Sequence, residues 1–232
     1  MKNYTIISLV LAMLASTTLS ARELDISITN LTQGIYFTPL LLAAHDNNTH
    51  LFEAGNTASA NLQAMAEGGD ISGLSSDLIA VNANISENPA AGLLPPGNST
   101  TTTINTDAAN DYFSLVAMML PTNDGFVGLD ALKLPAKPGT YTYFLNAYDA
   151  GTEANDEVIN GAGTPGSPGI PADPGANHGS GASGVTTLEN NTMVHIHRGN
   201  LGDTDPVGGN SDVDSRIHRW LNPIARLVIT LK

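Results

Sequence analysis

The chain has 232 residues, with 22 aspartates and glutamates against 9 lysines and arginines, a formal net charge of −13 and no cysteine. Nucleic-acid backbones and anionic membrane surfaces attract basic patches, so this acidic balance argues against both as partners. The absence of cysteine excludes a disulfide framework, a cysteine-ligated zinc site and a thiol nucleophile. A hydrophobic content of 41% is sufficient for a folded core, and one β-rich domain can occupy the whole length.

Residues 1–21 have the layout of a secretory signal peptide. Lys2 supplies a short positive region, an apolar run extends from Ile6 to Ala15, and small residues follow it. A bilayer span needs about 20 apolar residues, so this run is too short, and a membrane-anchoring first helix is the alternative. We therefore expect a secreted protein, periplasmic or extracellular, that is not inserted in a membrane once mature.

The first half of the remaining chain contains two predicted strands and one predicted helix. Apolar and polar residues alternate along Leu24–Leu31, which is typical of a half-buried strand. Thr38–Ala44 is a continuous apolar run that fits either a strand or a buried turn. Thr57–Gly68 has a helical pattern, with Thr57 or Ser59 as the N-cap and Gly69 beyond its end.

The second half is predicted to be mostly strands and loops. Residues 86–103 are polar and rich in threonine, and they are predicted to form a loop. Four further segments carry strand patterns, namely Tyr112–Leu120, Gly139–Ala147, Thr192–His197 and Ala225–Leu231. At least six strands against one helix predict an all-β fold, an antiparallel two-layer β-sandwich with one short helix and long loops.

A Gly/Pro-rich stretch at residues 160–184 has almost no large apolar side chain, which predicts a long surface loop. It could also be a linker between two domains. However, the segment that follows it contains only two convincing strands, too few for an independent domain. We therefore predict a single domain over residues 22–232.

Acidic residues are the strongest indication of a binding site. From Glu23 to Leu132 there are 12 acidic residues and neither lysine nor arginine. These carboxylates are either solvated surface groups or ligands that converge on a hard cation such as calcium, which takes six to eight oxygens. Asp149 and Glu153 are the best local pair, because the glycine between them permits a sharp turn. Two further acidic loops carry Asp124, Asp130, Asp203, Asp205, Asp212 and Asp214.

His195 and His197 are predicted to place two imidazoles on the same face of a strand. This spacing occurs in metal sites, usually with a third ligand, for which His218 is a candidate. The alternative is an ordinary strand face with two partly exposed histidines. Motifs of serine hydrolases, zinc proteases, P-loop proteins and dinucleotide-binding enzymes are all missing. A scattered Ser-His-Asp triad stays open as an alternative, but no pattern in the sequence supports it, and we predict a non-catalytic protein.

Short motifs along the chain resemble one known family. They are Thr29–Thr32 (TNLT), Tyr36–Leu40 (YFTPL), Leu51–Gly55 (LFEAG), Gly125–Asp130 (GFVGLD), Tyr148–Glu153 (YDAGTE) and Asn222–Ile229 (NPIARLVI). In this order and spacing, from about Leu24 to Leu231, they resemble the spondin N-terminal domain family in its secreted prokaryotic form. The resemblance implies an eight-stranded antiparallel sandwich similar to C2 modules, with calcium in the loops at one end. In animal relatives the domain acts in extracellular-matrix adhesion and recognition, without catalysis.

The resemblance also implies ligands. The family's Y-D-A-G-T-D loop falls on Asp149 and Glu153, where glutamate replaces the second aspartate. The acidic residue before F-V-G falls on Asp124, and Asp130 also matches an acidic family position. The cysteines and thrombospondin-type repeats of animal relatives are absent, and the loop at 160–184 has no counterpart.

The resulting prediction is a secreted, non-catalytic, calcium-binding recognition or adhesion domain with an extracellular or cell-surface ligand. Two alternatives stay open. One is an exported metalloenzyme that uses His195 and His197, and the other is a purely structural component of an extracellular matrix.

Overall fold

The computed structural model describes residues 21–175 and 179–232. The predicted signal peptide therefore lies, except for Ala21, outside the described residues. Within the described ranges, no helix combines the length and the apolar character that a membrane crossing requires.

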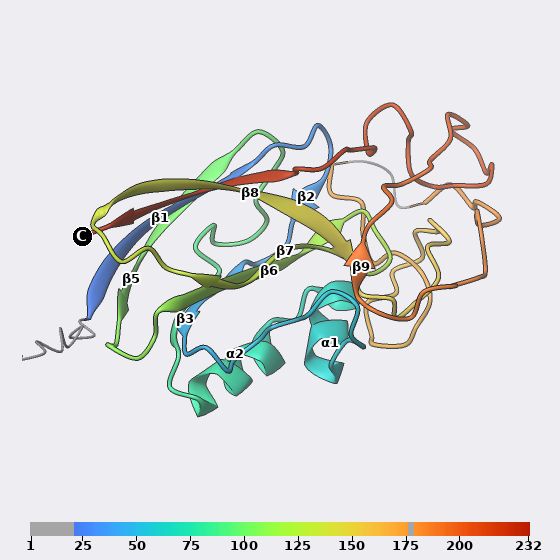
Figure 1. Ribbon diagram of the computed structural model, residues 1–232. Helices are drawn as coiled ribbons and strands as arrows, with labels where there is room; N and C mark the ends of the chain where they lie inside the picture. The colour runs from blue at the N-terminus through green and yellow to red at the C-terminus, as the bar shows by residue number, and fades with distance from the viewer. Residues whose placement is uncertain (1–20, 176–178) are drawn as a thin grey trace, which may run out of the picture.

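The described chain forms an antiparallel sheet with two helices on one side (Figure 1). Eight strands pair along the path β4-β3-β6-β7-β8-β10-β1-β5, while β2 pairs with β6 and β9 pairs with β8. The strands are β1 (Arg22–Asn30), β2 (Tyr36–Phe37), β3 (Leu41–His45), β4 (Asn84–Glu87), β5 (Ser99–Thr106), β6 (Tyr112–Leu120), β7 (Gly125–Lys133), β8 (Gly139–Asp149), β9 (His195–Ile196) and β10 (Ala225–Leu231). The helices are α1 (Ala60–Gly68) and α2 (Ser72–Ala80).

The strand path curls until its ends approach each other. Strand β8 divides its pairing, because Gly139–Leu145 pairs with β10 and Asn146–Asp149 pairs with β7. At the two ends of the path, the hydroxyl groups of Ser86 on β4 and Thr102 on β5 lie 2.8 Å apart. The predicted antiparallel all-β class is confirmed, and the sheet is nearly barrel-shaped rather than clearly divided into two layers.

Apolar side chains fill two cores, one on each side of β3 and β6. The first lies inside the curled sheet, where alternate residues of β1 such as Leu24, Ile26 and Ile28 are buried. The second lies between the sheet and the helices and includes Met65 of α1 and Leu74 of α2. Strands β3 and β6 are buried on both faces, which explains their uninterrupted apolar sequences.

The predicted helix is confirmed, but it is not the only one. The Ser59 hydroxyl accepts a hydrogen bond from the Leu62 amide, and Gly69 ends α1 in the left-handed region. The expectation of one short helix was wrong because α2 follows at once. Its serine-rich sequence buries only three residues, so it gives little helical periodicity.

The loop predicted at residues 86–103 was also partly wrong. Strand β4 extends to Glu87, and β5 starts at Ser99 and pairs with β1 over its length. Four consecutive threonines favour a strand through their β-branched side chains, yet most of β5 is exposed, which hides the apolar alternation. Conversely, only His195–Ile196 of the segment predicted at 192–197 forms a strand.

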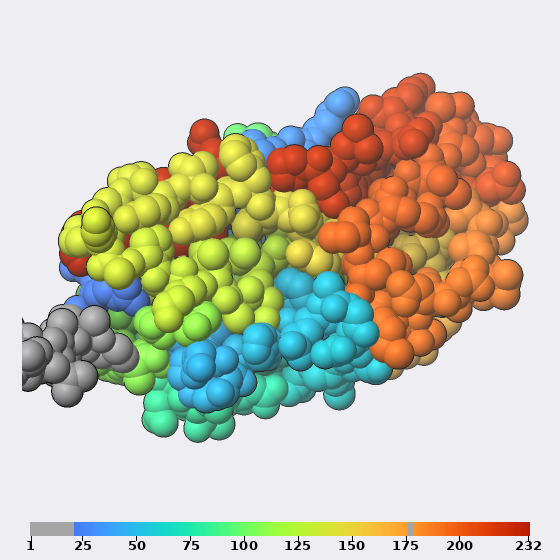
Figure 2. Space-filling view, in the orientation of Figure 1, coloured from blue at the N-terminus to red at the C-terminus, as the bar shows by residue number. Residues whose placement is uncertain are grey.

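The described part of the loop at 160–184 contains no helix or strand, but it is not wholly at the surface. Ile170 is fully buried in a small cluster with Ile159 and Val213. The segments that follow β8 gather at one end of the strands, at the opposite end from the C-terminus (Figure 1). Figure 2 shows their orange and red atoms massed over that end of the molecule, which we call the loop cap (residues 150–175 and 179–224).

Candidate metal centre

Two aspartates meet where β7 and β8 reach the loop cap. Antiparallel register pairs Gly125 with Asp149, so Asp124, one residue before Gly125, lies beside the end of β8. The side chains of Asp124 and Asp149 are almost completely buried. The strand pairing therefore brings together two of the predicted metal ligands that are far apart in the sequence.

Asp124 has one satisfied and one unsatisfied carboxylate oxygen. Its Oδ2 accepts hydrogen bonds from the amide and hydroxyl of Thr152, at 2.8 and 3.1 Å, and a longer one from the Glu153 amide. Its Oδ1 is buried without a hydrogen-bond partner. Burial, together with the negative charge of Asp149, raises the pKa of Asp124 to about 7.

The second aspartate is held by its own turn. Asp149 Oδ1 accepts from the Gly151 amide at 2.8 Å, and Oδ2 accepts from the side-chain amide of Asn155 at 2.8 Å. Gly151 has φ of +68°, and a Cβ there would lie 2.7 Å from the backbone of Thr192 and Met193. The turn therefore requires glycine, and burial raises the pKa of Asp149 above its ordinary range.

Glu153 reaches the same region from the turn after β8. Its Oε2 accepts from the Gly169 amide at 3.0 Å, so the Gly/Pro-rich loop closes over it. Its Oε1 is buried without a hydrogen-bond partner. Burial raises the pKa of Glu153 to about 8, and the negative charges of Asp124 and Glu67 add to this effect.

No lysine or arginine among the described residues compensates these three acids. Neither lysine nor arginine there forms an ion pair with Asp124, Asp149 or Glu153. As the side chains of residues 21–175 and 179–232 are placed, no three His, Asp or Glu groups converge enough to hold a metal ion alone. A cation here would need carbonyl or water oxygens as well, which calcium accepts readily.

Both strand histidines lie near Asp149 Oδ2. His195 Nε2 is 3.7 Å from it, and His197 Nε2 is 4.0 Å from it. His197 Nδ1 accepts a hydrogen bond from the Gly199 amide, so the neutral ring carries its proton on Nε2. Burial lowers the pKa of His197 to about 3. A protonated Nε2 has no free lone pair, which argues against His197 as a metal ligand in this arrangement.

His195 has a more open position. Its Nδ1 lies 2.8 Å from the Met193 carbonyl, to which it donates, and its Nε2 faces Asp149. His218, the suggested third partner, lies elsewhere and faces Asp173 at 3.5 Å. The predicted histidine site thus contributes at most His195 beside Asp149.

Asp130 is not brought to this cluster. It lies six residues beyond Asp124, and because β7 is extended the two positions are separated by about 20 Å. Its Oδ1 accepts from the Leu51 amide at 2.6 Å, and its Oδ2 lies 2.5 Å from His50 Nδ1. Asp130 therefore fastens the segment after β3 to the outside of β7.

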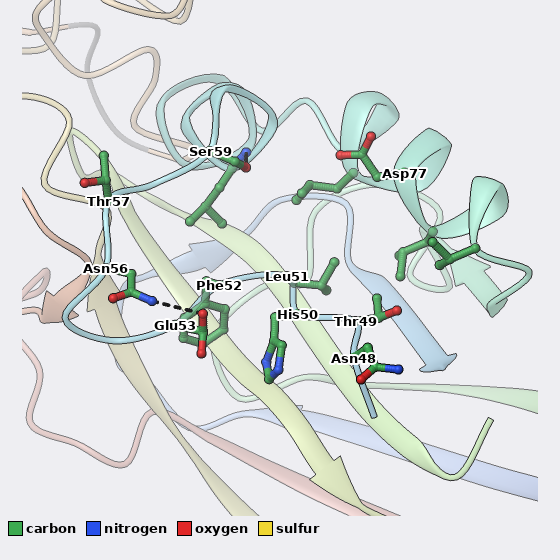
Figure 3. Close-up of a pocket in the computed structure, with 14 residues that line it drawn as sticks. Asn48, Thr49, His50, Leu51, Phe52, Glu53, Asn56, Thr57, Ser59 and Asp77 are labelled. Atoms are coloured by element: carbon green, nitrogen blue, oxygen red, sulfur yellow. Dashed lines mark hydrogen bonds between the residues drawn. The ribbon is translucent and has the colours of Figure 1, made fainter. Parts of the chain in front are cut away.

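That segment borders a surface groove of about 450 Å³ beside the helices (Figure 3). Leu62, Leu74 and Leu78 are among its apolar lining residues, and His50 and Glu53 are among its polar ones. In Figure 3, Glu53 accepts a hydrogen bond from Asn56. The acids of the groove lie away from Asp124 and Asp149, because Glu53 is in the segment after β3 and Asp77 is on helix α2.

The remaining acidic loop also stays apart. Asp203 accepts hydrogen bonds from the amides of Asp205, Asn210 and Ser211. Asp212 accepts from the amides of Ile159, Ser180 and Ala182 and from the Ser180 hydroxyl, and Asp214 pairs with Arg216. These carboxylates hold the loop cap together.

Sequence reasoning missed the groups that position the cluster. Thr152 and Asn155 lie in the acidic turn itself, so their polar side chains were a local indication. Gly169 gave no indication, because its amide reaches Glu153 only through the folding of a long loop.

Comparison with known proteins adds one match. A family model described as Spondin_N matches residues 29–160, which is more than half of the chain. This range contains Asp124, Asp149 and Glu153, and it ends where the Gly/Pro-rich loop begins. It is narrower than the resemblance from Leu24 to Leu231. No curated protein matches the chain.

Proposed function

The chain belongs to the spondin N-terminal domain family, and from that premise we propose that it is a secreted, non-catalytic recognition or adhesion domain that binds calcium. Residues 1–21 would direct its export, and its ligand would be an extracellular or cell-surface molecule. A C2-like packing of the strands is part of the same proposal.

The observation that carries the calcium proposal is the pair of unsatisfied buried oxygens, Asp124 Oδ1 and Glu153 Oε1. A buried carboxylate without a partner is costly, and like charges nearby increase that cost. A divalent cation would satisfy both oxygens and offset the repulsion between Asp124 and Asp149. The donor set is entirely oxygen, which suits calcium rather than a softer metal.

The proposed calcium ligands would come from the ends of two strands and from the turn that follows β8. Asp124 would supply its free oxygen from the start of β7, and Asp149 would supply a carboxylate from the end of β8. Glu153 would supply its free oxygen from the turn and connect the ion, through Gly169, to the Gly/Pro-rich loop. Calcium would provide charge compensation and rigidity at the end of the sheet where the loop cap begins.

Calorimetric titration of the purified protein with calcium tests the proposal, with thermal unfolding measured in calcium and in chelator. We expect saturable binding, a higher melting temperature in calcium, and loss of both effects in Asp124→Asn and Asp149→Asn. Asp130→Asn is the matched control, because its carboxylate lies on another part of β7. The calcium proposal fails if wild type binds no calcium, or if Asp130→Asn alone abolishes binding.

Two alternatives are resolved by related measurements. An exported metalloenzyme is favoured by the position of His195 Nε2, 3.7 Å from Asp149 Oδ2, and it predicts bound zinc or a redox metal that His195→Ala releases. A purely structural matrix component predicts calcium-dependent stability with no calcium-dependent binding of the labelled protein to its native cell surface or matrix. Calcium-dependent surface binding that a chelator reverses would support the recognition role.

A further inference from the structure

A second acidic site lies inside the loop cap, apart from the metal centre. It is a cavity of about 280 Å³, which we call the aspartate pocket. Among the described residues, its charged and titratable lining groups are Asp173, Asp203, Asp205, Asp212, Asp214, Arg216 and His218. Five carboxylates therefore surround one cavity with a single guanidinium, and none of them belongs to the metal centre.

Asp173 is the unsatisfied member of this set. Its side chain is 3% exposed, and its Oδ1 has no hydrogen-bond partner. The nearest basic group is His218 Nε2 at 3.5 Å, but His218 Nδ1 accepts from the Asp214 amide, so the ring is held as the neutral Nε2–H tautomer. Burial of Asp173 is thus not compensated by a full positive charge.

Three of the other carboxylates, those of Asp203, Asp212 and Asp214, are held in place by amide hydrogen bonds or by Arg216. Amide hydrogen bonds, the one from Ser211 first, hold the pKa of Asp203 below its ordinary value. Burial alone would raise the pKa of Asp212, but the amides of Ser180 and Ile159 outweigh it and lower that pKa. The pocket therefore presents a rigid negative lining that nothing within the described residues neutralises except Arg216.

We propose that the aspartate pocket binds an organic cation, an alkylammonium or guanidinium group, with Asp173 as its buried counter-ion. The cation could come from a free polyamine or from a lysine or arginine side chain of a partner polypeptide. Both sources present N–H donors, which reach carboxylates at about 2.7–2.9 Å.

A metal ion fits this pocket less well than an organic cation. The carboxylate oxygens of Asp203 and Asp212 already accept hydrogen bonds from several backbone amides. Calcium needs six to eight oxygens within about 2.6 Å. The cavity is also close to the lower end of the roughly 300–1,000 Å³ range of small-molecule pockets.

The chain itself shows that the wall of the pocket accepts a guanidinium. Arg216 donates to both oxygens of Asp214, from Nε at 3.0 Å and from Nη2 at 2.7 Å. Because Arg216 is largely exposed, an incoming cation can compete with it for Asp214. Removal of the Arg216 guanidinium should therefore strengthen binding, whereas removal of the Asp173 charge should weaken it.

Calorimetric titration of the purified protein with spermidine and with N-acetyl-arginine amide tests this proposal, in calcium and in chelator. We expect at least one probe to bind in both conditions, roughly tenfold more weakly to Asp173→Asn, since a buried charge partner is lost. Arg216→Ala should bind more tightly than wild type, and Asp130→Asn should bind as wild type does. Binding of spermidine alone assigns the site to free polyamines, and binding of the arginine probe assigns it to polypeptide side chains.

Several results would contradict the proposal that the aspartate pocket binds an organic cation. Absence of binding by both probes, or equal affinity of wild type and Asp173→Asn, would overturn the proposal. If Asp173→Asn does not fold, Arg216→Ala keeps the test valid, because weaker or unchanged binding by that variant contradicts it. Binding that exists only in chelator would place the cation in the metal centre instead.

Discussion

The metal centre and the Glu157 site of the loop cap both bury carboxylates, but they satisfy them in opposite ways. Asp173, which is also in the cap, resembles the metal centre in this respect, because its Oδ1 has no hydrogen-bond partner. In the cap, Glu157 Oε1 accepts from the Leu201 amide, and its Oε2 accepts from the Gly202 amide and the Ser211 hydroxyl. In the metal centre, Asp124 leaves one oxygen without any partner. The number of acidic residues in a region therefore does not show whether it is a cation site. What matters is whether backbone amides already satisfy their oxygens.

The largest expected effect comes from the turn that forms the metal centre. In Gly151→Ala, the new Cβ would collide with backbone at 2.7 Å, and the left-handed φ adds strain of about 1–3 kcal/mol. We expect the free energy of unfolding to fall by at least that amount, with loss of calcium binding, measured by urea denaturation and calorimetry. Gly161→Ala is the matched control, because Gly161 also has positive φ but nothing within 4 Å of the new Cβ. If both variants lose the same free energy of unfolding, the collision of the new Cβ with the backbone at the turn is not the cause of the loss.

Because the two carboxylates are satisfied differently, the isosteric substitutions Asp124→Asn and Glu157→Gln should change stability in opposite directions. In chelator, Asp124→Asn should leave stability unchanged or raise it, because a buried charge disappears. Glu157→Gln should lower stability by about 1–3 kcal/mol, because an amide nitrogen would face a backbone donor that now lacks an acceptor. Urea denaturation in chelator and in calcium measures both. A loss for Asp124→Asn in chelator that matches the loss for Glu157→Gln would remove the distinction between the two regions.

The same contrast explains what the sequence could and could not predict. Asp149 and Glu153 lie in one turn, so local spacing was sufficient to select them. Asp124 was selected from its own acidic loop, and the motif resemblance joined it to the other two. Asp130 was selected with them because the segment looked like a loop, whereas extended β7 carries it away. The unpaired oxygens could not be predicted, because they depend on strand register and on where the amide of Gly169 arrives.

The acids of the metal centre and the amide-bonded aspartates of the cap, Asp203 and Asp212, should make stability depend on pH in opposite directions. The folded-state pKa values of Asp124 and Glu153 are raised to about 7 and about 8, so the folded metal-free protein binds more protons than the unfolded chain. Their contribution is therefore present at acid pH and is lost as the pH rises from about 4 to about 8. The pKa values of Asp203 and Asp212 are lowered, so their contribution is present above about pH 4 and is lost as the pH falls below it.

Urea denaturation between pH 4 and pH 9, in chelator and in calcium, measures this dependence. We expect metal-free stability to decline toward pH 8, and calcium to cancel the decline by favouring the ionised carboxylates. In chelator, Asp124→Asn should make the free energy of unfolding depend less on pH. Asp203→Asn should leave the decline of that free energy toward pH 8 unchanged. A metal-free profile that rises from pH 5 to pH 8 would contradict the assignment of uncompensated charge to the metal centre.

The smallest effect is expected at Asp130, which tests whether an acidic residue outside both regions matters to either. In Asp130→Asn the side-chain oxygen can still accept from the Leu51 amide, whereas the charge and the acceptor that face His50 Nδ1 are lost. The Asp130 carboxylate raises the pKa of His50, so its removal should return that pKa toward the ordinary value. Because the folded pKa is raised, the pair contributes stability below about pH 6.5 that is lost as the pH rises through the folded pKa. His50 is 38% exposed, so this contribution should be no more than about 1 kcal/mol.

NMR titration of His50, with urea denaturation at pH 5 and pH 8, measures both the His50 pKa and the stability contribution of the pair. An unchanged His50 pKa, or a larger stability loss at pH 8 than at pH 5, would mean that Asp130 acts through its amide hydrogen bonds alone.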